Sequence, residues 1–115
     1  MFTKMFIEIT EIHNGESKKA IPHTMLVNNK KAGRAVLTKT TKGKFKDYYL
    51  LSNVIIYKDF RGKKLCSIMI NKICSNYKNI YLKVKKDNIP AIKCYKKSKF
   101  KVFSETKYFY IMTKN

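Results

Sequence analysis

The chain has 115 residues, and its 26 Lys and Arg against seven Asp and Glu give a formal net charge of +19 at pH 7. This length suffices for one domain around a single hydrophobic core and excludes a second core. The charge suits a polyanionic ligand, but only Arg34 and Arg61 are Arg. Because base-edge and bidentate phosphate recognition favour the planar guanidinium, we do not favour nucleic acid as a partner, although the Lys-rich surface leaves that alternative open.

Export and membrane signals are missing from the sequence. Residues Met1 to Glu8 carry charges too early for the apolar region of a signal peptide. No apolar run approaches the length of a transmembrane helix. Cys66, Cys74 and Cys94 lack metal-ligand spacing and have no His nearby, so we expect reduced packing residues and no metal. These features predict a cytoplasmic or nuclear protein without a membrane partner.

Hydrophobic periodicity predicts one domain over residues 1–115 with strands separated by short turns. In chain order the predicted strands are residues 5–12, 24–28, 32–40, 48–57, 80–84, 100–103 and 108–112. A polar stretch at 13–22 follows the first strand, and Asn28-Asn29-Lys30 is a hairpin-type turn.

Two helices complete the predicted elements. The first runs from residue 62 to about 76 and carries an apolar stripe at helical spacing, formed by Leu65, Ile68, Met69, Ile73 and Cys74. The second begins after Asp87 or Asn88, either of which can cap it, and Pro90 is tolerated in its first turn.

The junction at residues 54–66 is the most informative segment. An apolar strand runs into Arg61-Gly62-Lys63-Lys64 and then opens a helix. A helix N-terminus presents unpaired N–H groups and the positive end of the helix dipole, which together can bind a phosphate. Taken alone, a solvated turn explains this pattern equally well.

A second segment gives the junction its meaning. Leu82-Lys83-Val84 is followed by Asn88, Ala91, Tyr95, Lys97 and Phe100. With the junction, this resembles the GNAT superfamily of acyl-CoA N-acyltransferases, in which a valine strand enters Arg-x-x-Gly-x-Gly/Ala and a later segment reads Asn-x-x-Ala-x-x-x-Tyr-x-Lys-x-Gly-Phe. The resemblance covers roughly residues 47–113. It departs at three positions, where Lys64 and Lys99 replace glycines and Cys66 replaces a glycine or alanine.

The resemblance implies an α/β (α+β) fold, a mixed, mostly antiparallel sheet with two main helices. The family usually places two helices between the first and second strands, where they wall one side of the acceptor site. Here only about eleven residues separate the strands at Ile12 and Thr24, roughly one average helix at most. We therefore expect a short member that lacks most of this helical wall.

Acetyl-CoA is the cosubstrate that the resemblance implies. The backbone of Ile55 and Ile56 would pair with its pantetheine arm, which Asn88 would also contact, and Lys97 would reach the nucleotide phosphates. The pyrophosphate would meet N–H groups of the loop, formed by Arg61, Gly62, Lys63, Lys64, Leu65 and Cys66. The alternative for Ile55 and Ile56 is an ordinary core strand, and the alternative for Lys97 is a solvated lysine.

Tyr95 is the catalytic residue implied by the resemblance. Its hydroxyl would face the sulfur and donate a proton to the leaving thiolate. The alternative is a tyrosine that only packs its ring in the core.

A general base is missing from the expected place. Many relatives carry a glutamate on the strand at 48–57, which here offers only Ser52 and Asn53. Among Glu8, Glu11, His13 and His23 upstream, we select His23 as the candidate base, against the alternative of a surface histidine. Near neutral pH roughly a quarter of an α-amine is neutral, against about a thousandth of a lysine side chain, so an acceptor that needs little deprotonation fits best.

Three functions follow as hypotheses. The first is an acetyl-CoA-dependent N-acetyltransferase acting on an amine of a peptide, a protein or a small anionic metabolite, because a charge of +19 repels polycations. The second is a degenerate acyltransferase fold that serves as a binding or adaptor module. The third is a Lys-rich polyanion-binding protein. The acceptor and the oligomeric state, for which a homodimer is one candidate, stay open.

Overall fold

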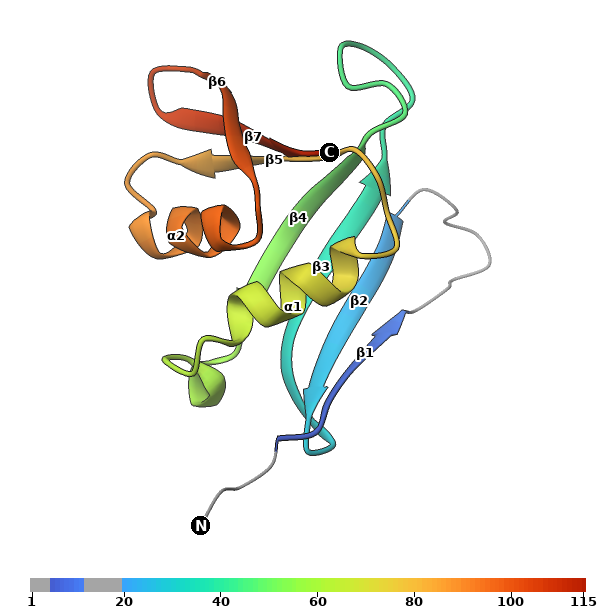
Figure 1. The fold of residues 1–115 in the computed structure, drawn as a ribbon, viewed down its shortest axis with the longest axis vertical. Helices are drawn as coiled ribbons and strands as arrows, with labels where there is room; N and C mark the ends of the chain where they lie inside the picture. The colour runs from blue at the N-terminus through green and yellow to red at the C-terminus, as the bar shows by residue number, and fades with distance from the viewer. Residues whose placement is uncertain (1–4, 12–19) are drawn as a thin grey trace.

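The computed structural model describes residues 5–11 and 20–115 (Figure 1). The polar stretch predicted at 13–22 and the short connection where we expect a missing helical wall lie largely outside these residues. The described elements are β1 (Ile7–Glu11), β2 (Ala20–Val27), β3 (Lys30–Lys39), β4 (Tyr49–Ile56), a 3₁₀ turn η1 (Lys58–Phe60), α1 (Leu65–Cys74), β5 (Ile80–Lys85), α2 (Ile89–Lys97), β6 (Lys101–Glu105) and β7 (Phe109–Lys114).

The strands form one sheet in the order β1-β2-β3-β4-β5-β7-β6. Every neighbouring pair described is antiparallel except β4 and β5. This mixed, mostly antiparallel sheet with two helices confirms the predicted fold class. In the described range, neither helix has the length and apolar character needed to cross a membrane.

The strand β2 begins at Ala20, four residues earlier than the sequence pattern predicts. The prediction stopped short because Pro22 cannot donate a ladder hydrogen bond. In the structure Pro22 pairs with Val36 of β3 and lies beyond the last described β1 pair, Glu11 with His23. Pro22 is thus part of the described β2–β3 ladder, and no described residue of β1 pairs with it.

The hairpin between β2 and β3 has the turn chemistry that the sequence indicates. Asn28 and Asn29 have φ values of 50° and 68°. Two consecutive left-handed residues match the twist of flanking strands in a type I′ turn, and Asn tolerates this conformation better than most residues.

The parallel strands β4 and β5 diverge after their first residues. Only Tyr49 with Ile80 and Leu50 with Tyr81 are paired, and Figure 1 shows the strands opening into a V from this shared end. An irregularity in the β3–β4 register coincides with Asn53, whose φ of 53° marks a left-handed bulge residue. Backbone groups on the β5 side of the second half of β4 therefore lack a strand partner from β5.

An aromatic cluster holds the closed end of the V together. Phe45, in the β3–β4 connection, stacks on Tyr81 of β5 with ring centroids 4.3 Å apart and planes 7° from parallel. Its ring also meets Phe103 of β6 edge-on at 5.4 Å, and the Thr40 and Tyr81 hydroxyls lie 3.0 Å apart. These contacts fix the start of β4 against β5, so the divergence is confined to the other end.

The hydrophobic core lies between the sheet and the two helices. The predicted apolar stripe of α1 is buried at Leu65, Met69, Ile73 and Cys74, while Ile68 is only partly buried. Each fully buried aliphatic side chain contributes about 1.5–3 kcal/mol. The β3 strand passes close to β4 at Gly33, where an added Cβ would lie 2.7 Å from the Ile55 carbonyl oxygen. Only glycine fits there without displacing the strand that borders the open V.

Candidate active site

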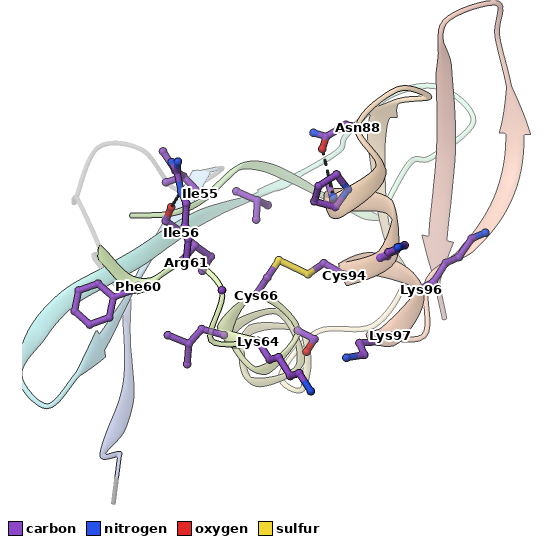
Figure 2. A pocket seen from close by; sticks show the side chains of 17 residues that line it. Ile55, Ile56, Phe60, Arg61, Lys64, Cys66, Asn88, Cys94, Lys96 and Lys97 are labelled. Atoms are coloured by element: carbon purple, nitrogen blue, oxygen red, sulfur yellow. Dashed lines mark hydrogen bonds between the residues drawn. A yellow bond between two sulfur atoms is a disulfide. The ribbon is translucent and has the colours of Figure 1, made fainter. Parts of the chain in front are cut away.

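A cavity of about 1060 Å³ lies where β4 and β5 diverge (Figure 2). Its walls come from the end of β4, the connection from η1 into α1, and α2. The lining residues are Val54, Ile55, Ile56, Phe60, Arg61, Gly62, Lys64, Leu65, Cys66, Ser67, Asn88, Pro90, Ala91, Lys93, Cys94, Lys96 and Lys97. Its volume reaches the upper end of the range for small-molecule and cofactor sites.

The N-terminus of α1 opens into this cavity without a cap. Lys64 occupies the N-cap position in a left-handed conformation, and its side chain makes no capping hydrogen bond. Lys64, Leu65, Cys66 and Ser67 all line the cavity. The first-turn N–H groups therefore lack an intrahelical or side-chain acceptor and form a seat for an anion.

Left-handed backbone conformations occur at the positions where the resemblance implies glycines, in this loop and after α2. Gly62 has a φ of 76°, and Lys64 and Lys99, which replace family glycines, have φ values of 60° and 74°. The conformations that the family pattern demands are thus kept, at a cost of about 1 kcal/mol for each non-glycine residue.

Positive charge surrounds the anion seat. Arg61, Lys64, Lys93, Lys96 and Lys97 line the cavity, and no carboxylate is among its described lining residues. The Arg61 Nε donates a hydrogen bond of 2.9 Å to the Ile56 carbonyl, which ties the loop to the end of β4. Its terminal guanidinium nitrogens stay available to a phosphate.

Asn88 borders the cavity as the N-cap of α2. Its Oδ1 accepts a hydrogen bond of 3.3 Å from the Ala91 N–H, and Figure 2 shows this contact beside the cavity. The capping role predicted for Asn88 is therefore confirmed. The amide nitrogen of Asn88 keeps two donors for a ligand.

Tyr95 does not line the cavity, although its neighbours Cys94 and Lys96 do. The Tyr95 ring packs against Phe100 with centroids 5.9 Å apart, and the residue is 8% exposed. Its hydroxyl has no hydrogen-bond partner in the described structure and is not among the buried unpaired atoms, so it reaches solvent. Burial raises the pKa of Tyr95, which keeps the phenol protonated at neutral pH.

His23 does not line the cavity, and it fits neither the predicted general base nor the alternative of a surface histidine. It is 1% exposed, so it is not a surface histidine. Its ring nitrogens lie 2.8 Å from the Ile21 carbonyl oxygen and 3.1 Å from Glu11 Oε1. The same Glu11 oxygen accepts a hydrogen bond from Tyr77, and burial followed by the Glu11 charge raises the pKa of Tyr77 to about 12.

This histidine cluster sits at the opposite end of α1 from the anion seat. Tyr77 follows the C-terminus of α1, whereas the cavity is lined by residues of its first turn. A helix of ten residues is about 15 Å long, so His23 cannot reach an acceptor at the V. The described cavity wall contains no His, Asp or Glu that could replace it as a base.

The prediction of three reduced cysteines is wrong for two of them. Cys66 of α1 and Cys94 of α2 form a disulfide, with Cα atoms 6.0 Å apart. Figure 2 shows the bond crossing between the two helices in the middle of the cavity view. Cys74 is a free, buried thiol, and burial raises its pKa to about 11. No sequence pattern indicates this pair, because the two cysteines lie 28 residues apart on separate helices.

The sequence therefore located most of the cavity wall but not all of it. The predicted site residues that do not line the cavity are His23, Lys63 and Tyr95. The lining residues that were not predicted as site residues are Val54, Phe60, Ser67, Pro90, Ala91, Lys93, Cys94 and Lys96. Lys93 and Lys97 are four residues apart on α2, and this spacing was the one signal that could have added Lys93.

Comparisons with known proteins agree with this geometry. The acetyltransferase (GNAT) family matches residues 3–100, and the chain belongs to this family. A search of curated proteins finds no match.

Solved structures share the fold at low sequence identity. The N-acetyltransferase PseH of Campylobacter jejuni is 14% identical, with a TM-score of 0.75 over 95% of this chain and 97% of that one. A Bacillus subtilis acetyltransferase solved with CoA is 13% identical, with a TM-score of 0.74 over 96% and 97%. The aminoglycoside acetyltransferase AAC(6')-Ib, also solved with CoA, is 14% identical, with a TM-score of 0.70 over 86% and 68%.

Proposed function

We propose that residues 1–115 form one acetyltransferase domain that binds acetyl-CoA in the cavity and transfers its acetyl group to an amine. The uncapped N-terminus of α1 carries this proposal, because it opens into the same cavity as the diverging end of β4. Two relatives of this fold were solved with CoA. The anion seat would hold the pyrophosphate, and the β4 edge at Ile55 and Ile56, which has no strand partner from β5, would bind the pantetheine arm.

The reaction needs a neutral amine, a polarised carbonyl and a proton for the departing sulfur. The amine nitrogen bonds to the acetyl carbon, and the carbon–sulfur bond then breaks with its electron pair leaving on sulfur. Free N–H groups of β4 would stabilise the negative charge on the carbonyl oxygen. Tyr95 would donate its hydroxyl proton to the thiolate and regain a proton from solvent, and the new amide nitrogen loses a proton to water.

The missing base restricts the acceptor. With no His, Asp or Glu on the described cavity wall, the amine must lose its proton to solvent before it attacks. An α-amine or another amine of low pKa meets this condition far more often than a lysine side chain. Because the net charge is +19, we propose an amine of a peptide or protein in an acidic context, or a small anionic metabolite amine.

Cofactor binding is tested by thermal unfolding. We expect acetyl-CoA at 100 times its Kd to stabilise the fold by about 2.7 kcal/mol, because it binds the native state alone. The backbone amide NMR signals of Arg61 to Ser67 should also shift, and these shifts should saturate at the acetyl-CoA concentration that saturates the thermal stabilisation. If saturating acetyl-CoA changes neither the melting curve nor these signals, the family likeness extends to the fold only.

A binding protein without turnover is the second candidate, favoured by the absence of a base on the described cavity wall. Release of the CoA thiol, measured with and without candidate amines, separates the two functions. Binding with amine-dependent thiol release supports the enzyme, and binding without it supports the adaptor.

The Lys64→Gly variant separates backbone from side-chain recognition of phosphate. Glycine relieves the left-handed strain, so we expect the free energy of unfolding to rise by about 1 kcal/mol. Acetyl-CoA affinity should stay unchanged or improve, because the α1 N–H groups are retained. Denaturant unfolding and calorimetric titration measure the two quantities.

Lys99→Gly is the matched control for this variant. Lys99 has a similar φ of 74°, and the change removes the same charge, but Lys99 does not line the cavity. It should raise stability similarly and leave affinity unchanged. A loss of affinity above tenfold in the Lys64 variant alone would show that its ammonium group holds phosphate.

A further inference from the structure

A second hollow, of about 460 Å³, lies where β5 ends and the β6–β7 hairpin turns. Its lining residues are Lys85, Lys86, Asp87, Lys107, Tyr108 and Phe109, none of which lines the larger cavity. This volume falls within the range for small-ligand sites.

Backbone hydrogen bonds join the two segments that line the hollow. The Lys86 N–H donates a hydrogen bond of 2.9 Å to the Tyr108 carbonyl, which joins the two segments across the hollow. Lys85 and Phe109 are paired in the β5–β7 register. The hairpin itself is closed at Thr106, whose backbone N–H and side-chain oxygen both bond to Phe109 at 2.9 and 3.2 Å.

The charges of the hollow favour an anion. The Lys86 ammonium is already paired with Glu105 at 2.6 Å. Lys85 and Lys107 are exposed and have no carboxylate partner among the described residues. The Lys107 ammonium instead lies 5.3 Å from the Tyr108 ring centroid, and Asp87 is the single carboxylate on the described wall. The two lysine cations lie beside the Tyr108 ring, which is 65% exposed. This combination favours a ligand that carries an anionic group on an apolar stem.

The hollow adjoins the proposed reaction centre. Asp87 lines the hollow, and the next residue, Asn88, lines the cofactor cavity. Both follow the C-terminal end of β5, the end at which β4 and β5 have separated. The Asp87–Asn88 turn thus borders both the hollow and the cofactor cavity.

We propose that this hollow anchors the acceptor by a carboxylate, which Lys85 and Lys107 bind while the amine extends toward the open V. The proposal rests on the proposed acetyl transfer and adds a place and a chemical class for the acceptor. A carboxylate from an acidic peptide side chain and one from a small amino acid share this chemistry, and the experiment includes both.

Binding is tested first without any cofactor. Backbone amide shifts are measured while an N-acetylated Asp-Glu-rich peptide, its Asn-Gln counterpart or free glutamate is titrated. We expect saturable shifts at Lys86 and Lys107 to Phe109 with the acidic peptide and not with the neutral one. Saturation by glutamate alone would assign the hollow to a small amino acid. Shifts spread over the lysine-rich surface without saturation would overturn the proposal.

Charge reversal then tests the two lysines. Lys85→Glu and Lys107→Glu should each weaken binding of the carboxylate ligand at least tenfold and lower kcat/KM for the free-amine acidic peptide similarly. Affinity for acetyl-CoA should not change. Lys31→Glu is the matched control, since Lys31 is exposed, lies in the β2–β3 hairpin and changes the net charge equally. Equal losses in the Lys31 variant would reduce the effect to overall charge and overturn the proposal.

Different results would overturn the anchoring site and the proposed acetyl transfer. Localised carboxylate binding without acetyl transfer to the free-amine peptide, under conditions where acetyl-CoA binds, would overturn the acceptor role together with the proposed function. Acetyl transfer that is indifferent to the acceptor's carboxylates would overturn the anchoring site and leave the transferase intact.

Discussion

Replacing Tyr95 with Phe is expected to lower turnover by about 10²-fold or more while acetyl-CoA affinity persists. The ring, which packs on Phe100, is retained, and only the hydroxyl that reaches solvent is removed. The loss should appear in kcat and kcat/KM together, because the proton is needed only as the carbon–sulfur bond breaks. Steady-state thiol release measures it, with calorimetric titration of acetyl-CoA alongside.

The pH dependence of turnover is a second test of Tyr95 as the proton donor. Burial raises its pKa, so the donor is fully protonated at neutral pH and loses its proton only above the ordinary tyrosine value near 10. Below that limit the rate should rise with pH through the pKa of the acceptor amine, because no base assists its deprotonation. The Phe variant should keep this rise and lose the alkaline fall.

Tyr110→Phe is the matched control for the hydroxyl. Tyr110 is half-buried on β7 and does not line the cavity. The turnover of the Tyr110→Phe variant should therefore equal that of the unchanged protein. If the Tyr95 variant also keeps full turnover, Tyr95 packs in the core and donates no proton.

Reduction of the Cys66–Cys94 disulfide is expected to lower the free energy of unfolding by about 3.5 kcal/mol. The bond closes a loop of 28 residues, and the chain-entropy relation gives this value for the freedom that the unfolded chain regains. For a domain of this size the melting temperature should fall by roughly 10–15 °C. Thermal unfolding with and without dithiothreitol measures the change.

The Cys66→Ser, Cys94→Ser double variant is the control for this experiment. It should melt at the temperature of the reduced protein and should not respond to dithiothreitol. Cys74 is buried and free, so it contributes nothing to the difference. Two alkylatable thiols gained on reduction of the unfolded protein identify the bond directly. A melting curve that ignores reductant would contradict a tether between α1 and α2.

The sequence determined the elements and the anion seat because both depend on local interactions. The apolar stripe of α1 follows from helical spacing, and the Asn28-Asn29 turn follows from the left-handed tolerance of Asn. The strand–loop–helix order at Arg61 to Cys66 likewise placed helix N–H groups after a strand, which is the arrangement that the structure has. Even the replaced glycines at Lys64 and Lys99 mark positions whose φ is positive.

Tertiary structure decided which of these residues meet. His23 carried a plausible chemistry in the sequence, but strand pairing with Glu11 placed it at the far end of α1. Cys66 and Cys94 sat in a pattern typical of packing residues, yet the crossing of α1 and α2 brought their Cα atoms within 6.0 Å. Lys85 and Lys107 line the same hollow only because the β5–β7 register brings their segments together. Local periodicity cannot encode such encounters, since they depend on how distant segments pack against the same sheet.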